Sequence, residues 1–262
     1  MDATGLDAFP EAGDMSTTIT HARTAIVLGG SGSVGGALLH ALFHDEGFGT
    51  VITLSRRSLP EAVALARATG RRLVEKLVPD MAPKSLAAAT LEVARAVGGE
   101  LEGFSVLGVG ADTAKLTLEA HRAVDVALNE AFARALRESG QVRHLAFMSA
   151  AGADPTAKTS GSGAAGMARY NRVKGEAEEA VRASGPAIVS VFRPAMIIGS
   201  RHTPWLLAKA LPLFSFVTPG KYRSIRVEQI AGAMIAAAKR HPAMGATYHY
   251  PEMIGLIAGE RR

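Results

Sequence analysis

The apolar positions of this chain alternate between short continuous runs and longer stretches with helical spacing. Continuous apolar and β-branched runs predict buried strands, and apolar positions three and four apart predict helices that cover them. The runs predict strands at residues 25–28, 50–55, 73–78, 104–107, 145–149 and 188–192. The spaced positions predict helices at residues 61–68, 84–97, 116–138, 169–183 and 227–239. This alternation indicates an α/β fold with a doubly wound parallel sheet, the Rossmann architecture.

The pattern predicts one domain preceded by an arm. Residues 1–22 have acidic side chains but neither a basic start nor an apolar core, so we expect a flexible arm rather than a secretory signal. Residues 23–262 are expected to form a single nucleotide-binding domain, in which residues 196–262 make most of the substrate side. The helix at residues 227–239 is expected to close this domain.

A glycine-rich turn joins the first strand to an uncharged helical stretch. Gly29, Gly32 and Gly35 have the spacing of a turn that bends tightly, admits a pyrophosphate against bare backbone and packs its helix close to the strand. A turn that is glycine-rich only for flexibility is the alternative. The strand before it and the helix after it favour dinucleotide binding.

Two arginines follow the second predicted strand. A carboxylate at this place would hold the ribose hydroxyls of NAD, whereas Arg56 and Arg57 suit the additional phosphate of NADP. Two arginines that simply open a surface loop are the alternative. With the glycine turn upstream, the sequence predicts NADP(H) as the cofactor.

A tyrosine and a lysine four residues apart lie on a predicted helix after the strand that ends at Ser149. Residues four apart share one face of a helix, so Tyr170 and Lys174 can point into the same cleft. A free tyrosine has a pKa near 10, and a nearby ammonium favours the phenolate. The pair can therefore act as a general acid toward a carbonyl oxygen, which a serine hydroxyl at the strand end could also hold.

These features resemble the short-chain dehydrogenase/reductase (SDR) superfamily, specifically its atypical branch around the Tat-interactive oxidoreductases. The resemblance spans residues 24–213 and is carried by five motifs in the family's order. They are Leu-Gly-Gly-Ser-Gly-Ser-Val-Gly at 28–35, Thr-Leu-Ser-Arg-Arg at 53–57, Ser-Ala-Ala-Gly-Ala-Asp at 149–154, Tyr-Asn-Arg-Val-Lys-Gly-Glu at 170–176 and Phe-Arg-Pro-Ala at 192–195.

The resemblance implies a Rossmann-type oxidoreductase with a serine, tyrosine and lysine as catalytic residues, here Ser149, Tyr170 and Lys174. It implies that Lys174 also bonds the nicotinamide ribose, that Asp80 contacts the adenine, that Gly108 lines the adenosine half and that Pro194 shapes the nicotinamide site. The full implied cofactor set is Gly29, Ser31, Gly32, Ser33, Val34, Gly35, Arg56, Arg57, Asp80, Gly108, Lys174 and Pro194.

The chain departs from the family pattern at three places. Asp125 stands where many relatives place an asparagine that fixes a relay water, residues 106–110 lack the usual asparagine, and Ala195 replaces a glycine. Two alternatives to an NADPH-dependent carbonyl oxidoreductase therefore stay open. One is a cofactor-binding sensor with little catalysis; the other is a sugar epimerase or dehydratase, although the long C-terminal region usual in those enzymes is missing.

Composition narrows the function classes further. The 262 residues have a net charge of +5, but the basic residues are scattered and only 5% of residues are aromatic, so we expect no nucleic-acid partner. The absence of cysteine excludes disulfides and cysteine zinc sites and fits a cytoplasmic protein. Glycines and serines interrupt the uncharged run at 25–43, so we expect no membrane span. A monomer or homodimer acting on a small carbonyl compound is expected.

Three further features have a functional and a structural reading. His40 and His44 are four apart on a helix, but no acidic partner accompanies them, so no metal is expected. The glycine- and serine-rich residues 152–166 are either a lid over the cleft or an ordinary surface loop. The apolar residues at 203–216 either line a substrate pocket or form a small core, and Arg201 and His202 are the nearest polar candidates for substrate contact.

Overall fold

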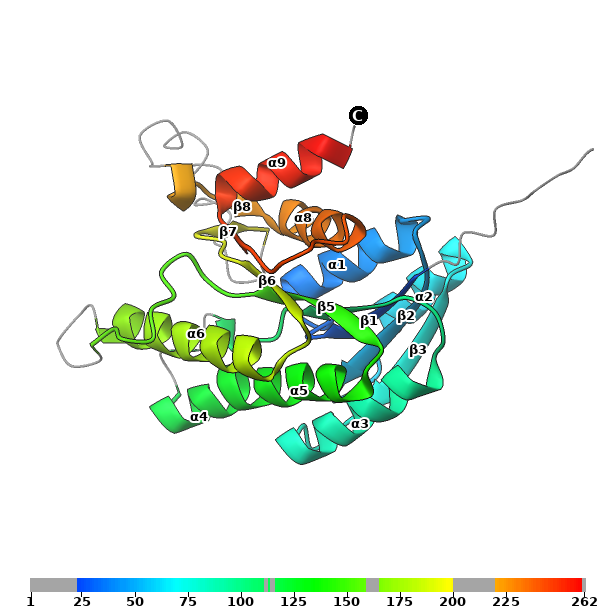
Figure 1. Cartoon of the computed structure of the whole chain (residues 1–262), viewed down its shortest axis with the longest axis horizontal. Coiled ribbons are helices and arrows are strands. Elements are labelled where there is room, and N and C mark those ends of the chain that lie inside the picture. Colours follow the sequence, from blue (N-terminus) through cyan, green and yellow to red (C-terminus); the bar gives the residue numbers. More distant parts are fainter. Residues whose placement is uncertain (1–22, 111–112, 114–115, 159–164, 200–219, 261–262) are drawn as a thin grey trace, which may run out of the picture.

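The computed structural model describes residues 23–110, 113, 116–158, 165–199 and 220–260 (Figure 1). Within these residues, seven parallel strands form a central sheet in the order β3-β2-β1-β4-β5-β6-β9. The strands are β1 (Arg23–Leu28), β2 (Phe48–Ser55), β3 (Arg72–Leu77), β4 (Leu101–Ser105), β5 (Val142–Met148), β6 (Ile188–Phe192) and β9 (Thr247–Tyr248). A separate parallel pair is formed by β7 (Ile197–Ile198) and β8 (Ile225–Arg226).

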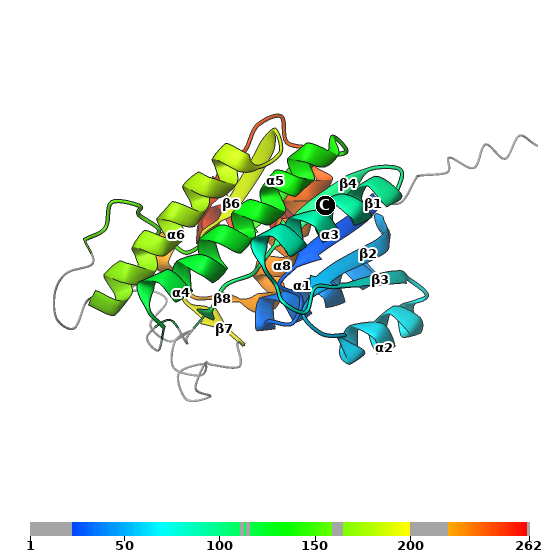
Figure 2. The same cartoon turned by 90° about the horizontal axis from the view of Figure 1, so that it is seen from below.

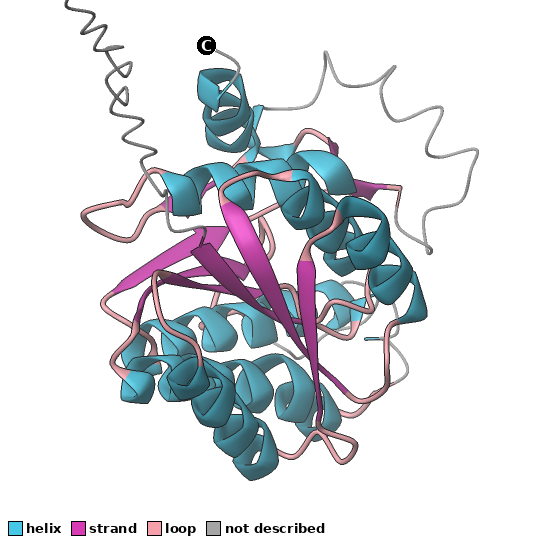
Figure 3. Cartoon of the chain, turned by 90° about the vertical axis from the view of Figure 1, so that its right-hand side faces the viewer, coloured by secondary structure: helices cyan, strands magenta, loops and turns pink. Residues whose placement is uncertain are grey.

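Helices cover both faces of this sheet, which confirms the predicted doubly wound α/β fold (Figure 3). The helices are α1 (Ser33–His44), α2 (Pro60–Thr69), α3 (Pro83–Ala96), α4 (Leu118–Arg122), α5 (Asn129–Ser139), α6 (Ala165–Ser184), α8 (Val227–Lys239) and α9 (Tyr250–Glu260). A π-helical segment, η2 (Ala123–Leu128), joins α4 to α5, and a 3₁₀ turn, η4 (Gly220–Tyr222), precedes β8. Helices α3, α5 and α6 lie side by side on one face (Figure 2), and α1 and α8 pack together on the other.

The alternation of side chains along β1 divides the core into two layers. Ala25 and Val27 belong to the cluster under α1 and α8, whereas Ile26 and Leu28 belong to the cluster under α3 and α5. All four side chains are fully buried, as expected for a central parallel strand with a period of two.

The strand order reverses between β1 and β4. In open α/β sheets, ligands bind at such a point, beyond the carboxyl ends of the strands.

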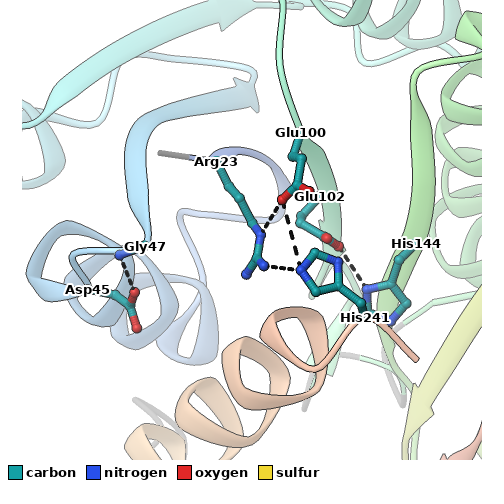
Figure 4. Close-up of polar contacts among 7 residues, drawn as sticks. All are labelled: Arg23, Asp45, Gly47, Glu100, Glu102, His144 and His241. Carbon is teal, nitrogen blue, oxygen red and sulfur yellow. Dashed lines mark hydrogen bonds and ion pairs between the residues drawn. The ribbon is translucent and has the colours of Figure 1, made fainter. Parts of the chain in front are cut away.

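A buried polar network crosses three strands of the sheet. His144 on β5 places Nδ1 2.9 Å from Glu102 Oε2 on β4 and Nε2 2.9 Å from Ser190 Oγ on β6. Figure 4 shows this Glu102–His144 contact near a more exposed cluster in which Arg23 contacts Glu100 and His241. Because each polar group in the network has a partner, its burial is tolerated.

Replacing Glu102 by alanine is expected to lower the free energy of unfolding by about 2–3 kcal/mol, because His144 Nδ1 would stay buried without its partner. The matched control is Glu100→Ala. Glu100 lies two residues before Glu102, but its side chain is 58% exposed in its pair with Arg23, so a loss below about 1 kcal/mol is expected. Urea unfolding of both variants measures the difference, and equal losses would contradict the structural role of the buried network.

Several element boundaries differ from the sequence prediction. Strand β4 begins at Leu101 rather than at residue 104. The prediction started too late because Glu102 interrupts the apolar run; in the structure this buried acid is stabilised by His144. The predicted helix at residues 116–138 begins at Leu118, where the Thr117 side chain caps it, and contains the π-helical segment. The prediction that the helix at 227–239 closes the domain is wrong, since β9 and α9 follow it. Among the described residues, no helix has the length and apolar character needed to cross a bilayer.

Candidate functional site

The turn between β1 and α1 can form only with glycine at two positions. Gly29 has a φ of +91°, and a Cβ there would lie 2.6 Å from the backbone nitrogen of Leu107. A Cβ at Gly35 would overlap the carbonyl oxygen of Gly29. The helix begins after Gly32, which has no side chain to cap the first-turn N–H groups. The turn therefore presents bare backbone and the positive end of a helix dipole, as an anion site requires.

A cavity of about 810 Å³ opens at this turn, beyond the carboxyl ends of β1 to β4. Its volume lies in the range of about 300–1,000 Å³ that is usual for small-molecule and cofactor sites. Its lining residues are Gly29, Gly30, Ser31, Gly32, Leu54, Ser55, Arg56, Arg57, Ser58, Leu59, Asp80, Met81, Val106, Leu107, Gly108, Val109, Leu116, Val124 and Leu128. Seven of the predicted cofactor residues therefore line one cavity: Gly29, Ser31, Gly32, Arg56, Arg57, Asp80 and Gly108. Leu107 and Met81 also line it, although the sequence did not predict them as cofactor residues.

The remaining residues of the predicted turn lie beside this cavity rather than in its wall. Ser33 lines a second cavity of about 470 Å³ that shares Gly32 with the first and continues along α1 toward Gly199 and Val227. Val34 and Gly35 are buried. These two residues serve the packing of α1 against the sheet, as the close contact between Gly35 and Gly29 indicates.

The charged residues of the large cavity are exposed. Arg56 and Arg57 form no ion pair with any residue that the structure describes, so both guanidinium groups can accept an anionic ligand. Asp80 follows β3, and its carboxylate accepts hydrogen bonds from the Ser85 hydroxyl at 2.7 Å and from the Ala82 N–H at 3.3 Å. This end of the cavity therefore holds two guanidinium groups and one carboxylate.

Lys174, on α6, lies against Gly108 of the cavity wall but does not itself line the cavity. Its Nζ lies 2.6 Å from Asp125 Oδ1, and a Cβ added at Gly108 would lie 2.9 Å from the same Nζ. The side chain is 4% exposed. Burial opposes the ammonium form, but the charges of Asp125 and Tyr170 outweigh it, so the pKa of Lys174 lies above its ordinary value. Lys174 is therefore an ammonium directly beneath the glycine of the cavity wall.

Tyr170 lies one helical turn before Lys174. The Lys174 Nζ is 5.8 Å from the centre of the Tyr170 ring, and this ring also stacks with His121 at 6.1 Å between centroids. His121 is fully buried, and neither of its ring nitrogens has a hydrogen-bond partner among the described residues. Burial, opposed in part by Asp125, lowers the pKa of His121, so this imidazole is neutral at neutral pH.

Ser149 and Pro194 follow neighbouring strands. The Ser149 N–H donates to the carbonyl of Phe192 at 2.7 Å, and the Ala151 N–H donates to the carbonyl of Pro194 at 2.9 Å. The Ser149 hydroxyl is buried and has no partner among the described residues. An orphaned hydroxyl at a strand end marks a place where a ligand atom can complete the hydrogen bonding.

The first half of the predicted lid is anchored to α6. The Asp154 N–H donates to the carbonyl of Asn171 at 2.9 Å, and a Cβ at Gly175 would overlap the backbone of Pro155. Residues 159–164 of the predicted lid lie outside the described residues, as do Arg201, His202 and the apolar residues at 203–216. A lid movement of the segment at residues 152–158 would have to break these contacts.

The two histidines of α1 stack on each other with 4.4 Å between ring centroids, and both are exposed. The structure groups no three metal-ligating side chains anywhere in the described residues.

The sequence reading missed the partners of Lys174. It treated Asp125 only as a substitute for a relay asparagine, and it did not consider His121 or Asn129. Asn129 donates to the Asp125 carbonyl at 2.8 Å and accepts from the Ser105 hydroxyl, so it ties the π-helical segment to the end of β4. The spacing of His121 and Asp125, four residues apart, could have predicted that these two side chains are neighbours. It could not have predicted the contact of Asp125 with Lys174, which lies on another helix.

Comparisons with known proteins give similarity in structure only. No family model matches the chain, and no curated protein matches it. A short-chain dehydrogenase/reductase from Serratia marcescens BCRC 10948 superposes with a TM-score of 0.60 at 18% identity, over 87% of this chain and 97% of that one. This chain has the SDR fold.

Two other similar solved structures are described by a bound cofactor or by an activity. BdcA in complex with NADPH has a TM-score of 0.56 at 19% identity, over 86% of this chain and 92% of that one. ChuY, an anaerobillin reductase from Escherichia coli O157:H7, has a TM-score of 0.56 at 16% identity, over 87% of this chain and 98% of that one. At such identities the likeness concerns the fold, and activity has to be argued from the site.

Proposed function

We propose that this chain is an NADPH-dependent oxidoreductase of the SDR superfamily that transfers hydride to a small carbonyl compound, with Tyr170 as the proton donor. The observation that carries the proposal is the position of the Lys174 ammonium directly beneath Gly108, in the wall of the cavity formed by the glycine turn. The five sequence motifs support placing it in the atypical branch around the Tat-interactive oxidoreductases. The complex of BdcA with NADPH, on the same fold, supports the choice of cofactor class.

The residues present fit a phosphorylated dinucleotide. The bare backbone at Gly29 and Gly32 and the start of α1 would hold the pyrophosphate. Arg56 and Arg57 would bind the additional phosphate of NADP, and Asp80 would contact the adenine end. Bound NADPH supplies a hydride. Ser149, whose buried hydroxyl has no partner among the described residues, and Pro194 would lie at the nicotinamide end of the proposed site.

The chain's own residues would manage the proton. The Tyr170 hydroxyl would donate its proton to the substrate oxygen as negative charge develops there, and the Ser149 hydroxyl would donate a hydrogen bond to the same oxygen. The Lys174 ammonium would stabilise the phenolate that remains. Two observations support these roles: Lys174 lies against Gly108 of the cavity wall, and the Ser149 hydroxyl has no partner among the described residues.

The double replacement of Arg56 and Arg57 by alanine is expected to weaken NADPH binding about 10-fold or more and to change NADH binding less than about 3-fold. Each arginine can form charge-assisted hydrogen bonds to the additional phosphate, and about 1.4 kcal/mol corresponds to a factor of ten. Fluorescence titration with both cofactors measures the two affinities. Arg67→Ala, an exposed arginine of α2 outside the cavity wall, is the control and should change neither. Equal weakening of both cofactors would remove the phosphate-binding role.

The activity itself is tested by screening aldehydes, ketones and quinones for consumption of NADPH by the purified full chain. Turnover of at least one class supports an oxidoreductase. Tight NADPH binding without turnover on any carbonyl would instead favour the cofactor sensor.

The accompanying expectation is a monomer or homodimer in the cytoplasm. Size-exclusion chromatography with light scattering tests the oligomeric state.

A further inference from the structure

A forked ion pair joins α6 to the end of β6. Arg193 is the first residue after β6; its Nε donates to Glu178 Oε1 at 2.8 Å, and its Nη2 donates to Glu178 Oε2 at 2.6 Å. The Glu178 side chain is 6% exposed and that of Arg193 is 25% exposed. Two parallel charge-assisted hydrogen bonds fix both the distance and the orientation of the groups that they join.

Glu178 continues the row of residues on α6 that the proposed chemistry uses. Tyr170, Lys174 and Glu178 are spaced four apart within α6, so they lie along one face of the helix. Lys174, in the middle of this row, lies against Gly108 of the cavity wall. Arg193 therefore holds the helix one turn beyond the lysine, on the same face.

The backbone on either side of Arg193 is bonded to the residues that follow β5. The carbonyl of Phe192 accepts the Ser149 N–H at 2.7 Å, and the carbonyl of Pro194 accepts the Ala151 N–H at 2.9 Å. The N–H of Arg193 itself donates to a carbonyl of β9 at 2.8 Å. The position of the Arg193 side chain is thus coupled through the backbone to the end of the site that holds Ser149 and Pro194.

We propose that Arg193 and Glu178 are positioning residues, whose ion pair fixes the α6 side of the proposed site relative to the side formed by the ends of β5 and β6. This inference rests on the proposed function, in which α6 supplies the proton donor and the ends of β5 and β6 lie at the nicotinamide end. Both residues act through others. Hydride and proton transfer need reacting atoms about 3–3.5 Å apart, so a displacement of about 1 Å can cost a factor of about 10².

Position explains this pair better than stability does. Burying the Glu178 carboxylate costs desolvation, which offsets much of its attraction to Arg193, and apolar side chains of similar volume often stabilise a fold as well as a buried ion pair does. Apolar side chains have no preferred direction of contact, whereas a guanidinium fork meets a carboxylate in one geometry. The specific property of the pair is therefore its fixed geometry.

The first test needs neither cofactor nor substrate. Arg193→Met/Glu178→Leu removes both charges and keeps apolar bulk, so the free energy of unfolding should stay close to that of the wild type. Hydrogen exchange of the Ser149 and Ala151 N–H groups should nevertheless become about 10-fold faster or more, because the carbonyls that accept them are held less firmly.

The matched control is a second forked pair on the same helix. Arg122 donates to Glu176 of α6 at 2.7 and 2.5 Å, but it joins that helix to α4 instead of to β6. Arg122→Met leaves Glu176 with its other partner, Arg172, at 3.0 Å. Exchange of the N–H groups after β5 should stay within about 2-fold of the wild type in this control.

Kinetics separate positioning from binding in the proposed reaction. In Arg193→Met/Glu178→Leu, kcat for carbonyl reduction should fall about 10- to 100-fold, while the KM of the carbonyl and the affinity for NADPH should change less than about 3-fold. Arg193→Lys keeps the charge but not the fork, so its kcat should lie between those of the wild type and the double variant. A merely stabilising pair would leave kcat unchanged in a double variant that unfolds like the wild type.

Unchanged hydrogen exchange in the double variant would overturn the proposal, and so would faster exchange with an unchanged kcat. If the wild type reduces no carbonyl but exchange is still faster in the variant, the proposed function fails while the positional role of the pair stands. If the double variant does not fold, Arg193→Lys takes its place with the same measurements. Exchange in Arg193→Lys should then be at least about 3-fold faster than in the wild type, and an unchanged rate would contradict the proposal.

Discussion

Replacing Tyr170 by phenylalanine is expected to lower carbonyl-dependent NADPH consumption by about 10²- to 10⁴-fold, the usual contribution of a positioned general acid. The substitution removes one hydroxyl and leaves the ring that stacks with His121 and lies beside Lys174. The fold and the cavity wall should therefore persist, and NADPH affinity should change less than about 3-fold. Steady-state kinetics together with cofactor titration separate the two effects.

The control for this variant is Tyr250→Phe, at the start of α9 and away from the cavity. It should leave turnover within about 2-fold of the wild type, because no proposed step uses that hydroxyl. Unchanged turnover in Tyr170→Phe would remove the proton-donor role, while loss of both turnover and NADPH binding would point to a disturbed site rather than to missing chemistry.

The local features of the fold could be predicted from the sequence because each depends on neighbouring residues. The alternation in β1 and the glycine turn after it are encoded within a dozen residues, and the structure places them as the pattern predicts. The spacing of Tyr170 and Lys174 likewise puts both on one face of α6. The regular apolar stripe of α8 predicts its observed bounds.

Features that depend on distant residues could not be predicted in this way. The buried Glu102 makes β4 look too polar for a central strand until its partner on β5 is known. Strand β9 has only two residues, and it is defined by pairing with β6 rather than by its own pattern. The π-helical segment that carries Asp125 has the apolar spacing of an ordinary helix, so its contact with Lys174 on α6 leaves no sequence signal.

The same contact explains how the site can hold a lysine that is almost entirely buried. A buried ammonium is costly without a counter-ion, and the single carboxylate within 4 Å among the described residues belongs to Asp125. The backbone of Val109 and the Asn129 amide fix the segment that carries this carboxylate. Stability and the proposed chemistry therefore depend on one ion pair, and the two can be separated by measuring unfolding without cofactor or substrate.

Lys174→Met is accordingly expected to lower the free energy of unfolding by about 3–5 kcal/mol, because it leaves the Asp125 carboxylate buried and uncompensated. The double variant Asp125→Asn/Lys174→Met should lose less than Lys174→Met alone, since no charge then stays buried. Urea unfolding of the wild type, both single variants and the double variant gives the coupling energy.

The matched pair Asp45–Lys239 has the same chemistry but a Lys239 side chain that is 35% exposed, so Lys239→Met should lose only about 1 kcal/mol. Losses at Asp125 and Lys174 that simply add would mean that the two side chains stabilise the fold independently, and the assignment of Asp125 as the partner that keeps Lys174 charged would then be wrong.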